Sequence, residues 1–261
     1  MSRKLGAIHF KQNGYAIICT GFESAELIKF ASNGFLATKI AFINQVAELC
    51  ERTGADVQDV ARGMGLDERI GAKFLSPGPG FGGSCFPKDL RAMAALGRIA
   101  GVPQQIVEAT IAANEHAKRR VVENIKELSG GSLRGLTLII LGVTFKPGTD
   151  DMREAPALDI LPSLAAAGAS LRIVDPHGQK YGALLFPMAI WHEDAYAAAD
   201  GAHMVVVLTD WPIFRALDLQ RLANMMVTPI IADFRNIYSN YSLRKANFSK
   251  VYQVGQKRAS L

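Results

Sequence analysis

The chain has 261 residues, of which 49% are hydrophobic and 20% are charged, and its formal net charge is +5. So high an apolar fraction with so small a net charge excludes an intrinsically disordered chain. No apolar run reaches the ~18–20 residues of a membrane span, and the basic first residues lack the apolar region of a signal peptide. We therefore expect a globular, cytoplasmic protein that does not enter a membrane.

The charge distribution and the cysteines narrow the classes further. Residues 234–261 hold six basic side chains and no acidic one, which is typical of a solvated, partly frayed tail. No basic stripe interleaved with aromatic residues occurs elsewhere, so we expect no nucleic-acid partner. Three widely spaced cysteines argue against a disulfide framework or a metal cluster. Cys19 and Cys50 stand in apolar surroundings and are expected to be buried thiols.

Residues 23–129 have the pattern of an all-helical domain, preceded by a segment, residues 1–22, that we interpret as irregular or as a remnant. Apolar residues three and four positions apart predict one long helix over residues 24–53, which Ser24 can cap and Gly54 ends. Shorter helices are expected at residues 57–62, at residues 67–70, from Pro87, and up to Leu128 after a break at Gly101 and Pro103.

Residues 130–261 change to short β-branched runs that alternate with helix-length segments. This alternation predicts a doubly wound parallel α/β domain, with the boundary near residues 129–135. Strands are expected at residues 136–142, 171–175, 204–208 and 229–232, and helices at residues 156–167 and 193–199.

The segment Gly78–Gly83 formally satisfies G-x-G-x-x-G, the fingerprint of a dinucleotide-binding turn. That turn joins a strand to a helix whose N-terminus receives the pyrophosphate. Here no strand precedes the glycines and Pro79 stiffens the turn, so we reject a standard NAD-binding domain. The glycines instead lead to Cys85, just before the helix that opens at Pro87. A thiol at a helix N-terminus near Lys88 has its thiolate favoured, although a small buried thiol is the alternative.

Three polar residues on helices are candidates for the same site. Lys29 and Asn33 are four residues apart, so a helix places both on one face, either at a site or in a solvated stripe. Asp89 follows Cys85 by four residues, and it either caps the helix or acts as a base.

The segment 145–154 is dense in charge and follows the first expected strand. The carboxyl ends of strands bind ligands in open α/β sheets. Lys146 and Arg153 could therefore hold phosphates there, or the segment could be an ordinary solvated loop.

Three segments together, Glu23–Asn33, Phe81–Asp89 and Phe145–Glu154, closely resemble the UDP-glucose/GDP-mannose dehydrogenase family. The resemblance runs from about Glu23 to at least Tyr238, with the motifs in the family's order. Among the members, the likeness is nearest to those that act on UDP-glucose.

The resemblance implies a reaction and a role for each matching residue. The family oxidises the C6 alcohol of a nucleotide sugar to a carboxylate with two NAD⁺. Cys85 matches the nucleophile that captures the aldehyde, Lys29 and Asn33 match the pair that stabilises the oxyanion or orients water, and Asp89 matches a proton-accepting carboxylate. Substrate contacts fall on Phe74, Leu75, Gly82, Lys146 and Arg235, with Arg69 reaching in from a partner subunit; Lys88 and Arg153 fall near the NAD phosphates.

The resemblance also implies partners. A homodimer through the helix 24–53 is expected, with UDP-glucose as the small-molecule substrate. Family members begin with an NAD-binding domain, and residues 1–22 are too few to form one. We therefore expect the C-terminal portion of a dehydrogenase, inactive alone, with the NAD-binding part lost or supplied by a separate chain.

The chain departs from the family at Phe234, where a glycine is usual between Asp233 and Arg235. Because a Phe adopts positive φ only at a cost, we expect this loop to be displaced and Arg235 to be mis-aimed.

Two other functions fit the sequence less well. One is a non-catalytic module that binds UDP-sugars and dimerises, or a gene remnant. The other is an NAD-independent Cys hydrolase, which requires a histidine base. The five histidines adjoin none of the motifs; they are His9, His116, His177, His192 and His203.

Overall fold

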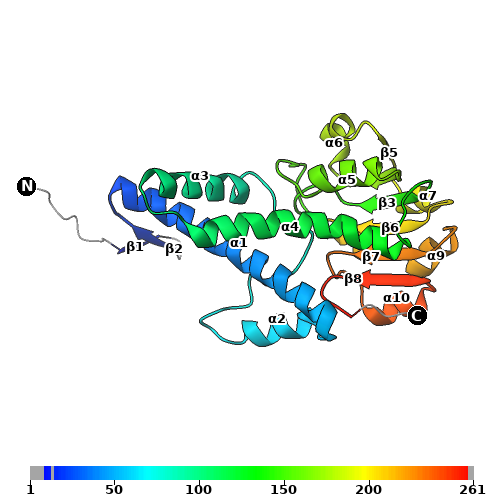
Figure 1. The fold of residues 1–261 in the computed structure, drawn as a ribbon, viewed down its shortest axis with the longest axis horizontal. Coiled ribbons are helices and arrows are strands. Elements are labelled where there is room, and N and C mark those ends of the chain that lie inside the picture. Colours follow the sequence, from blue (N-terminus) through cyan, green and yellow to red (C-terminus); the bar gives the residue numbers. More distant parts are fainter. Residues whose placement is uncertain (1–8, 13–14, 258–261) are drawn as a thin grey trace, which may run out of the picture.

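The structure, a computed structural model, describes residues 9–12 and 15–257. A helical part and an α/β part follow each other along the chain and lie side by side along the molecule's long axis (Figure 1). The predicted long helix is present as α1, Phe22–Thr53, and it ends at Gly54, whose φ of 83° suits a glycine. Its N-cap is Gly21, without a side-chain hydrogen bond, so the prediction that Ser24 caps it is wrong.

Three further helices complete the helical part: α2 (Val57–Gly65), α3 (Phe86–Ile99) and α4 (Gln105–Leu128). α1, α3 and α4 enclose a small apolar core that includes Ala37, Leu90 and Val107. The helix predicted at residues 67–70 is instead a hydrogen-bonded turn, in which the Asp67 carbonyl accepts from the N–H groups of Ile70 and Gly71. No described helix combines the length and apolar character needed to cross a bilayer.

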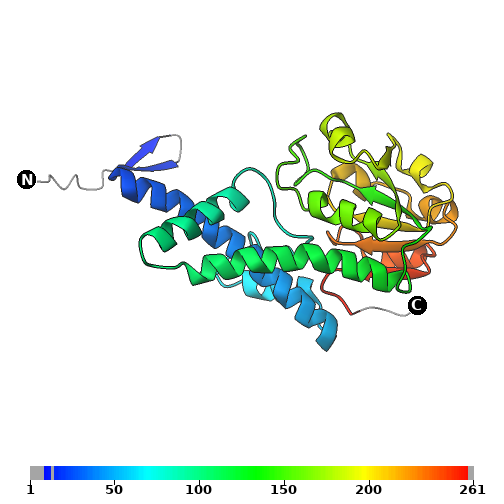
Figure 2. The same cartoon turned by 45° about the horizontal axis from the view of Figure 1, so that its top comes forward.

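A pair of antiparallel strands, β1 (His9–Gln12) and β2 (Tyr15–Ile18), precedes α1 at the end of the molecule farthest from the sheet (Figure 2). The prediction of an irregular segment over residues 1–22 is therefore wrong where it falls on these strands. Residues 1–8 lie outside the described part of the chain.

The α/β part contains a six-stranded sheet in the order β5-β4-β3-β6-β7-β8, in which every neighbouring pair is parallel. This order confirms the predicted doubly wound sheet. The strands are β3 (Thr137–Leu141), β4 (Ser170–Val174), β5 (Ala189–Trp191), β6 (Met204–Val207), β7 (Ile230–Asp233) and β8 (Lys250–Gln253). The helices are α5 (Ala157–Ala166), α6 (Gln179–Leu185), α7 (Ala195–Ala199), α8 (Pro212–Arg215), α9 (Leu219–Asn224) and α10 (Asn240–Lys245).

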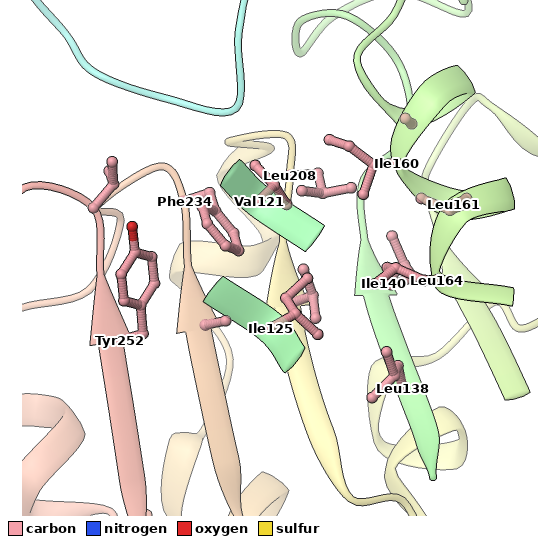
Figure 3. Packing of buried hydrophobic residues seen from close by; sticks show 14 of the residues in the cluster. Val121, Ile125, Leu138, Ile140, Ile160, Leu161, Leu164, Leu208, Phe234 and Tyr252 are labelled. Atoms are coloured by element: carbon pink, nitrogen blue, oxygen red, sulfur yellow. The ribbon is translucent and has the colours of Figure 1, made fainter. Parts of the chain in front are cut away.

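Alternate residues of the central strand β3 point into two different cores. Leu138 and Ile140 pack with residues of α4 and α5, whereas Ile139 and Leu141 pack with α7 and α9 on the opposite face. Figure 3 shows the first of these cores, with Ile125 of α4 over the strands. Because α4 belongs to the helical part and also covers the sheet, it joins the two parts through a shared core.

The described part of the basic tail belongs to this sheet, so the prediction that it is frayed is wrong there. Its basic side chains are nevertheless solvated as predicted, since Arg244, Lys245, Lys250 and Lys257 are exposed. β8 pairs with β7 along its length, and Tyr252 is buried against Phe234 with ring centroids 5.0 Å apart. The strand is only four residues long and begins with a lysine, which hides its period-2 pattern. Residues 258–261 of that tail lie outside the described residues.

A polar junction around Glu51 fastens the helical part to β8. One carboxylate oxygen of Glu51 accepts from the Tyr252 hydroxyl at 2.8 Å and from the Gly255 N–H at 3.0 Å. The other oxygen accepts from Arg120 of α4 at 2.7 Å. The Gly255 carbonyl in turn accepts from the Val57 N–H at 3.0 Å. Elements α1, α4 and β8 therefore meet at one carboxylate, and α2 is joined to them through Gly255.

We predict that Tyr252→Phe destabilises the protein by about 1–3 kcal/mol, because it removes the hydroxyl bonded to the buried Glu51 carboxylate and leaves the ring in place. Urea denaturation measures the change in the free energy of unfolding. Tyr241→Phe, at a tyrosine that is 74% exposed, is the matched control and should change stability by less than about 0.5 kcal/mol. Equal effects of the two substitutions would contradict the role given to this junction.

Candidate active site

A buried carboxylate, Asp89 of α3, lies against the polar face of α1. Its Oδ2 atom accepts a hydrogen bond from Asn33 Nδ2 at 2.7 Å and lies 3.6 Å from Lys29 Nζ. Lys88 Nζ lies 3.3 Å from Oδ1. Lys29 and Asn33 are one helical turn apart, so the packing of α1 on α3 brings both to the same carboxylate. The structure thus brings together three of the residues expected at the site.

The surroundings of Asp89 keep it ionised. Burial acts to raise the pKa of Asp89, but the Asn33 hydrogen bond and the charges of Lys88 and Lys29 outweigh it, and the pKa lies below its ordinary value. The side chain is 1% exposed. The N-cap position of α3 has no side-chain hydrogen bond, so Asp89 faces α1 and does not cap its own helix.

The three cysteines have different surroundings. Cys85 is exposed at the N-cap of α3, with its Sγ 3.8 Å from Ser84 Oγ, and its carbonyl accepts from the Asp89 N–H one turn later. Cys50 is buried as predicted, and burial raises its pKa. Cys19 is exposed, so the prediction of a buried thiol is wrong there: its apolar run forms a strand of the terminal pair outside the described cores.

The glycine loop, residues 77–84, is docked against the loop that joins β3 to α5. A Cβ atom on Gly82 would lie 2.2 Å from the Glu154 carbonyl oxygen, so only glycine fits. The Gly83 N–H donates to the Arg153 carbonyl at 2.8 Å, and the Phe145 ring covers Gly83. The glycines therefore serve close approach between two backbones, directly before Cys85.

Two asparagines that the sequence analysis missed hold the other side of this loop. Asn114 of α4 bonds both to the Phe81 N–H at 2.8 Å and to the Phe81 carbonyl at 3.0 Å. Asn44 of α1 accepts from the Gly78 N–H at 2.8 Å. Asn44 and Asn114 could have been identified from the sequence by one signal. Each is a polar residue on the inward face of a helix, in a chain that also has a glycine loop whose backbone groups need partners.

A pocket of about 250 Å³ lies between the glycine loop and the sheet. Its lining includes three of the predicted substrate contacts, Phe74, Gly82 and Arg235. Lys146 is exposed beside it, with its Nζ 5.2 Å from the centroid of the Phe145 ring, which also lines the pocket. The remaining lining residues are Ile40, Ser76, Gly78, Gly80, Phe81 and Phe86.

Besides Lys146, two of the predicted substrate contacts do not line this pocket. Leu75 is buried in the main core. Arg69 is exposed on the turn after α2 and pairs with Asp67 at 2.6 Å. Within one chain, the structure therefore brings only some of the predicted substrate contacts to the pocket.

The loop around Phe234 differs from the strained arrangement that the sequence suggested. Phe234 is buried against Tyr252, and the positive φ of the turn, 50°, falls on Asn236, a residue type that tolerates it. Arg235 is directed into the pocket, and its Nε donates to the Leu208 carbonyl at 2.7 Å. The expectation that Phe234 displaces this turn by strain is therefore wrong.

Buried aspartates at strand ends are the other residues that the sequence analysis missed. Asp233, at the end of β7, accepts from the N–H groups of Arg235 and Tyr238, and burial raises its pKa to about 6. Asp175, after β4, accepts from the N–H groups of Val143 and Gly178 at 2.7 Å each. An acidic residue directly after an apolar strand was the available signal.

Residues near Cys85 fit the outer edge of an NAD site but not a whole one. Arg153 and Lys88 are exposed cations, and Arg153 pairs with Asp151 at 2.7 Å. Exposed cations of this kind suit phosphate groups. The turn after β3, however, is closed: a Cβ on Gly142 would lie 2.4 Å from Thr209. Among the described residues, therefore, only Lys88 and Arg153 suit the phosphates of NAD, and the turn after β3 does not.

Two family models match the chain. Residues 23–116 match the central domain of the UDP-glucose/GDP-mannose dehydrogenase family, and residues 139–240 match the family's UDP binding domain. The chain therefore belongs to the UDP-glucose/GDP-mannose dehydrogenase family, as its three motifs predicted.

Individual relatives agree with this assignment. The UDP-glucose 6-dehydrogenase of Rhizobium meliloti (strain 1021) is 46% identical over 236 residues, which cover 90% of this chain and 54% of that protein. UDP-glucose 6-dehydrogenase TuaD of Bacillus subtilis (strain 168) is 44% identical over 233 residues, 89% of this chain and 50% of that protein. A UDP-glucose dehydrogenase structure from Pyrobaculum islandicum has a TM-score of 0.80 at 35% identity, covering 89% of this chain and 51% of that one. The chain thus spans about half the length of these relatives.

We predict that Asp89→Asn lowers stability at neutral pH but not in acid. A carboxylate with a lowered pKa stabilises the fold above the pKa of the unfolded chain, near pH 4, and this contribution is lost as the pH falls through the folded value. We expect a difference in unfolding free energy of about 1–3 kcal/mol at pH 7 that narrows well below pH 4. Urea denaturation at pH 7 and at pH 3 measures this difference in unfolding free energy.

The matched control is Asp150→Asn, which alters an exposed carboxylate and should leave stability within about 0.5 kcal/mol at either pH. A difference between wild type and Asp89→Asn that stays constant between pH 7 and pH 3 would refute the ionised role of Asp89.

Proposed function

We propose that this chain is the substrate-binding and thiol-bearing part of a UDP-glucose 6-dehydrogenase, which converts the C6 alcohol of UDP-glucose to a carboxylate. One observation carries the proposal: the Asp89 cluster, with Lys29 and Asn33, lies one turn after an exposed Cys85. The glycine loop that ends at Cys85 also lines the pocket that contains Arg235. Thiol, polar cluster and nucleotide-sugar pocket are therefore parts of one assembly.

In this proposal Cys85 divides the oxidation of the aldehyde into two steps. Its thiolate adds to the C6 carbonyl and forms a C–S bond, so the carbonyl oxygen becomes the oxyanion of a thiohemiacetal. NAD⁺, when bound, supplies the acceptor for the hydrides removed from C6. Loss of hydride from the thiohemiacetal leaves a thioester, and water cleaves its C–S bond to give the carboxylate and the free thiol.

The polar cluster stabilises charge in these steps. Lys29 provides an ammonium group and Asn33 an amide N–H donor on one face of a long helix, so both can face an oxyanion at C6. Asp89 holds the Asn33 amide by its hydrogen bond and keeps a negative charge beside Lys29. It is also the base that takes the proton of the attacking water.

Arg235 and Lys146 are the proposed partners of the diphosphate. Arg235 enters the pocket from the end of β7, and Lys146 stands beside the pocket next to Phe145. Both come from the carboxyl ends of parallel strands, where doubly wound sheets bind their ligands. Phe74 and Gly82 complete the substrate contacts of the pocket. Leu75 is assigned to the substrate by the family resemblance alone, since it lies in the main core, and Arg69 serves the partner subunit.

A thiol-protection experiment tests the proposal without requiring turnover. In a Cys19→Ser background, iodoacetamide should label exposed Cys85 and spare buried Cys50. We expect calorimetry to detect binding of UDP-glucose, and the C6 aldehyde of UDP-glucose to slow Cys85 labelling at least tenfold more than UDP-glucose itself, because the aldehyde forms the thiohemiacetal. Mass spectrometry of the labelled peptides measures this.

The alternative function, a UDP-sugar-binding module without catalysis, gives a different result. It predicts binding of UDP-glucose with equal, weak protection of Cys85 by the alcohol and by the aldehyde. This alternative rests on the match of residues 139–240 to the family's UDP binding domain, which supports nucleotide-sugar binding and does not require catalysis. If neither nucleotide sugar binds, both functions are wrong.

We further propose that the chain forms a homodimer through α1. Six large apolar side chains on α1 are exposed, which is unusual for a helix of a monomer. They are Phe22, Leu27, Ile28, Phe35, Phe42 and Leu49.

Analytical ultracentrifugation tests the dimer. We expect one species near twice the chain mass of 28.2 kDa, converted to monomer by Phe35→Asp. Leu184→Asp, at an equally apolar and exposed position on α6, is the control and should leave the dimer intact. A wild-type monomer would overturn this part of the proposal.

A further inference from the structure

Glu154, in the loop between β3 and α5, has a backbone conformation that is unusual for its residue type. Its φ is 53°, in the left-handed region. Among the described residues, four non-glycine residues have positive φ, and two of these are the tolerant asparagines 236 and 247. The other two, Phe74 and Glu154, both adjoin the glycine loop. Strain of this kind persists only where surrounding contacts determine it.

This conformation brings the Glu154 backbone against the glycine loop. The Glu154 carbonyl lies 2.2 Å from the place of a Gly82 Cβ. The preceding carbonyl, that of Arg153, accepts the Gly83 N–H at 2.8 Å. Relaxation of Glu154 to an ordinary conformation would move both carbonyls, and the turn that ends at Cys85 would lose this hydrogen bond.

The Glu154 side chain forms an ion pair with Arg91 of α3. Arg91 donates two hydrogen bonds to the Glu154 carboxylate, at 2.8 Å and 3.2 Å. Arg91 lies on the helix that begins directly after Cys85. The hydrogen bond and charge of Arg91 lower the pKa of Glu154, and those of Glu154 raise the pKa of Arg91. The side chain of Glu154 is 44% exposed, so burial does not fix it.

We propose that Arg91 and Glu154 are positioning residues: their ion pair holds residues 153–154 in the strained conformation that fixes the glycine loop beside Cys85. The ion pair links α3 to the β3–α5 loop. That loop contacts Gly82 and Gly83, and these glycines lead along the chain back to the start of α3. An exposed ion pair adds little to global stability, so its effect is confined to this loop. The part of the inference that concerns ligand affinity rests on the proposed function.

Hydrogen exchange at the Gly83 amide tests the positioning directly. In Arg91→Met we expect this amide to exchange at least tenfold faster than in the wild type, with the Tm unchanged. Arg98→Met is the matched control, because Arg98 lies on the same helix and pairs with Glu108 at 2.5 Å with similar exposure, away from the glycine loop. Equal Gly83 exchange rates in the two variants would overturn the inference.

Ligand affinity and charge reversal provide a second readout. Because Gly82 lines the pocket, Arg91→Met should weaken UDP-glucose binding five- to tenfold, whereas Arg98→Met should not. The double variant Arg91→Glu with Glu154→Arg should recover at least half of the lost affinity. Failure of the swap to recover any affinity would count against the ion pair. If wild-type protein binds no UDP-glucose, the proposed function fails, and Gly83 exchange alone decides the inference.

Discussion

The close approach of two backbones at Gly82 is the constraint on which the site depends. The glycine loop belongs to the helical part, and the Glu154 carbonyl that faces it belongs to the α/β part. Any side chain at position 82 would separate the two, because a Cβ cannot lie 2.2 Å from an oxygen. Cys85 follows three residues later, so the placement of the thiol relative to the sheet is fixed at this contact. The pocket has the same dependence, since Gly82 of the glycine loop and Phe145 of the β3–α5 loop both line it.

The Asp89 cluster is the complementary electrostatic constraint. Burying a carboxylate away from water is unfavourable unless it is hydrogen-bonded or paired with an opposite charge. The Asp89 carboxylate is stabilised by the amide of Asn33 and by the ammonium groups of Lys29 and Lys88, rather than by backbone N–H groups of its own helix. Because Lys29 and Asn33 lie on one rigid helix, the carboxylate fixes the position of α1 relative to the start of α3. Such an arrangement holds the ammonium group of Lys29 and the amide of Asn33 in fixed positions relative to the start of α3.

Elements with a strong local pattern could be predicted from the sequence. Helix α1 has a clear helical period, and four strands of the sheet are short runs rich in apolar and β-branched residues; the structure contains all of them. Strands without such a run could not be predicted: β8 begins with a lysine and ends with a glutamine, and β5 has only three residues. The pairing of Lys29, Asn33 and Asp89 came from a motif, whereas the supporting Asn44 and Asn114 act through backbone contacts that depend on how distant helices pack. Phe234 shows a different limit: the positive φ that a glycine would suggest has moved to Asn236.

The sheet has the strand order of a dinucleotide-binding fold, yet its own residues close the position where such folds bind. In that fold an acidic residue after the second strand contacts a ribose, and glycines after the first strand admit the pyrophosphate. Here Asp175 follows the second strand of the sheet, β4, and accepts instead from the N–H groups of Val143 and Thr144 in the turn after β3. The hydroxyl of Thr209 donates to the Thr144 carbonyl at 2.6 Å and closes the same turn. Among the described residues, one pocket at these strand ends opens toward the helical part, beside Arg235 and the glycine loop. Under the proposed function, a nucleotide bound there extends from the sheet toward Cys85, as oxidation of a sugar carbon at that thiol requires.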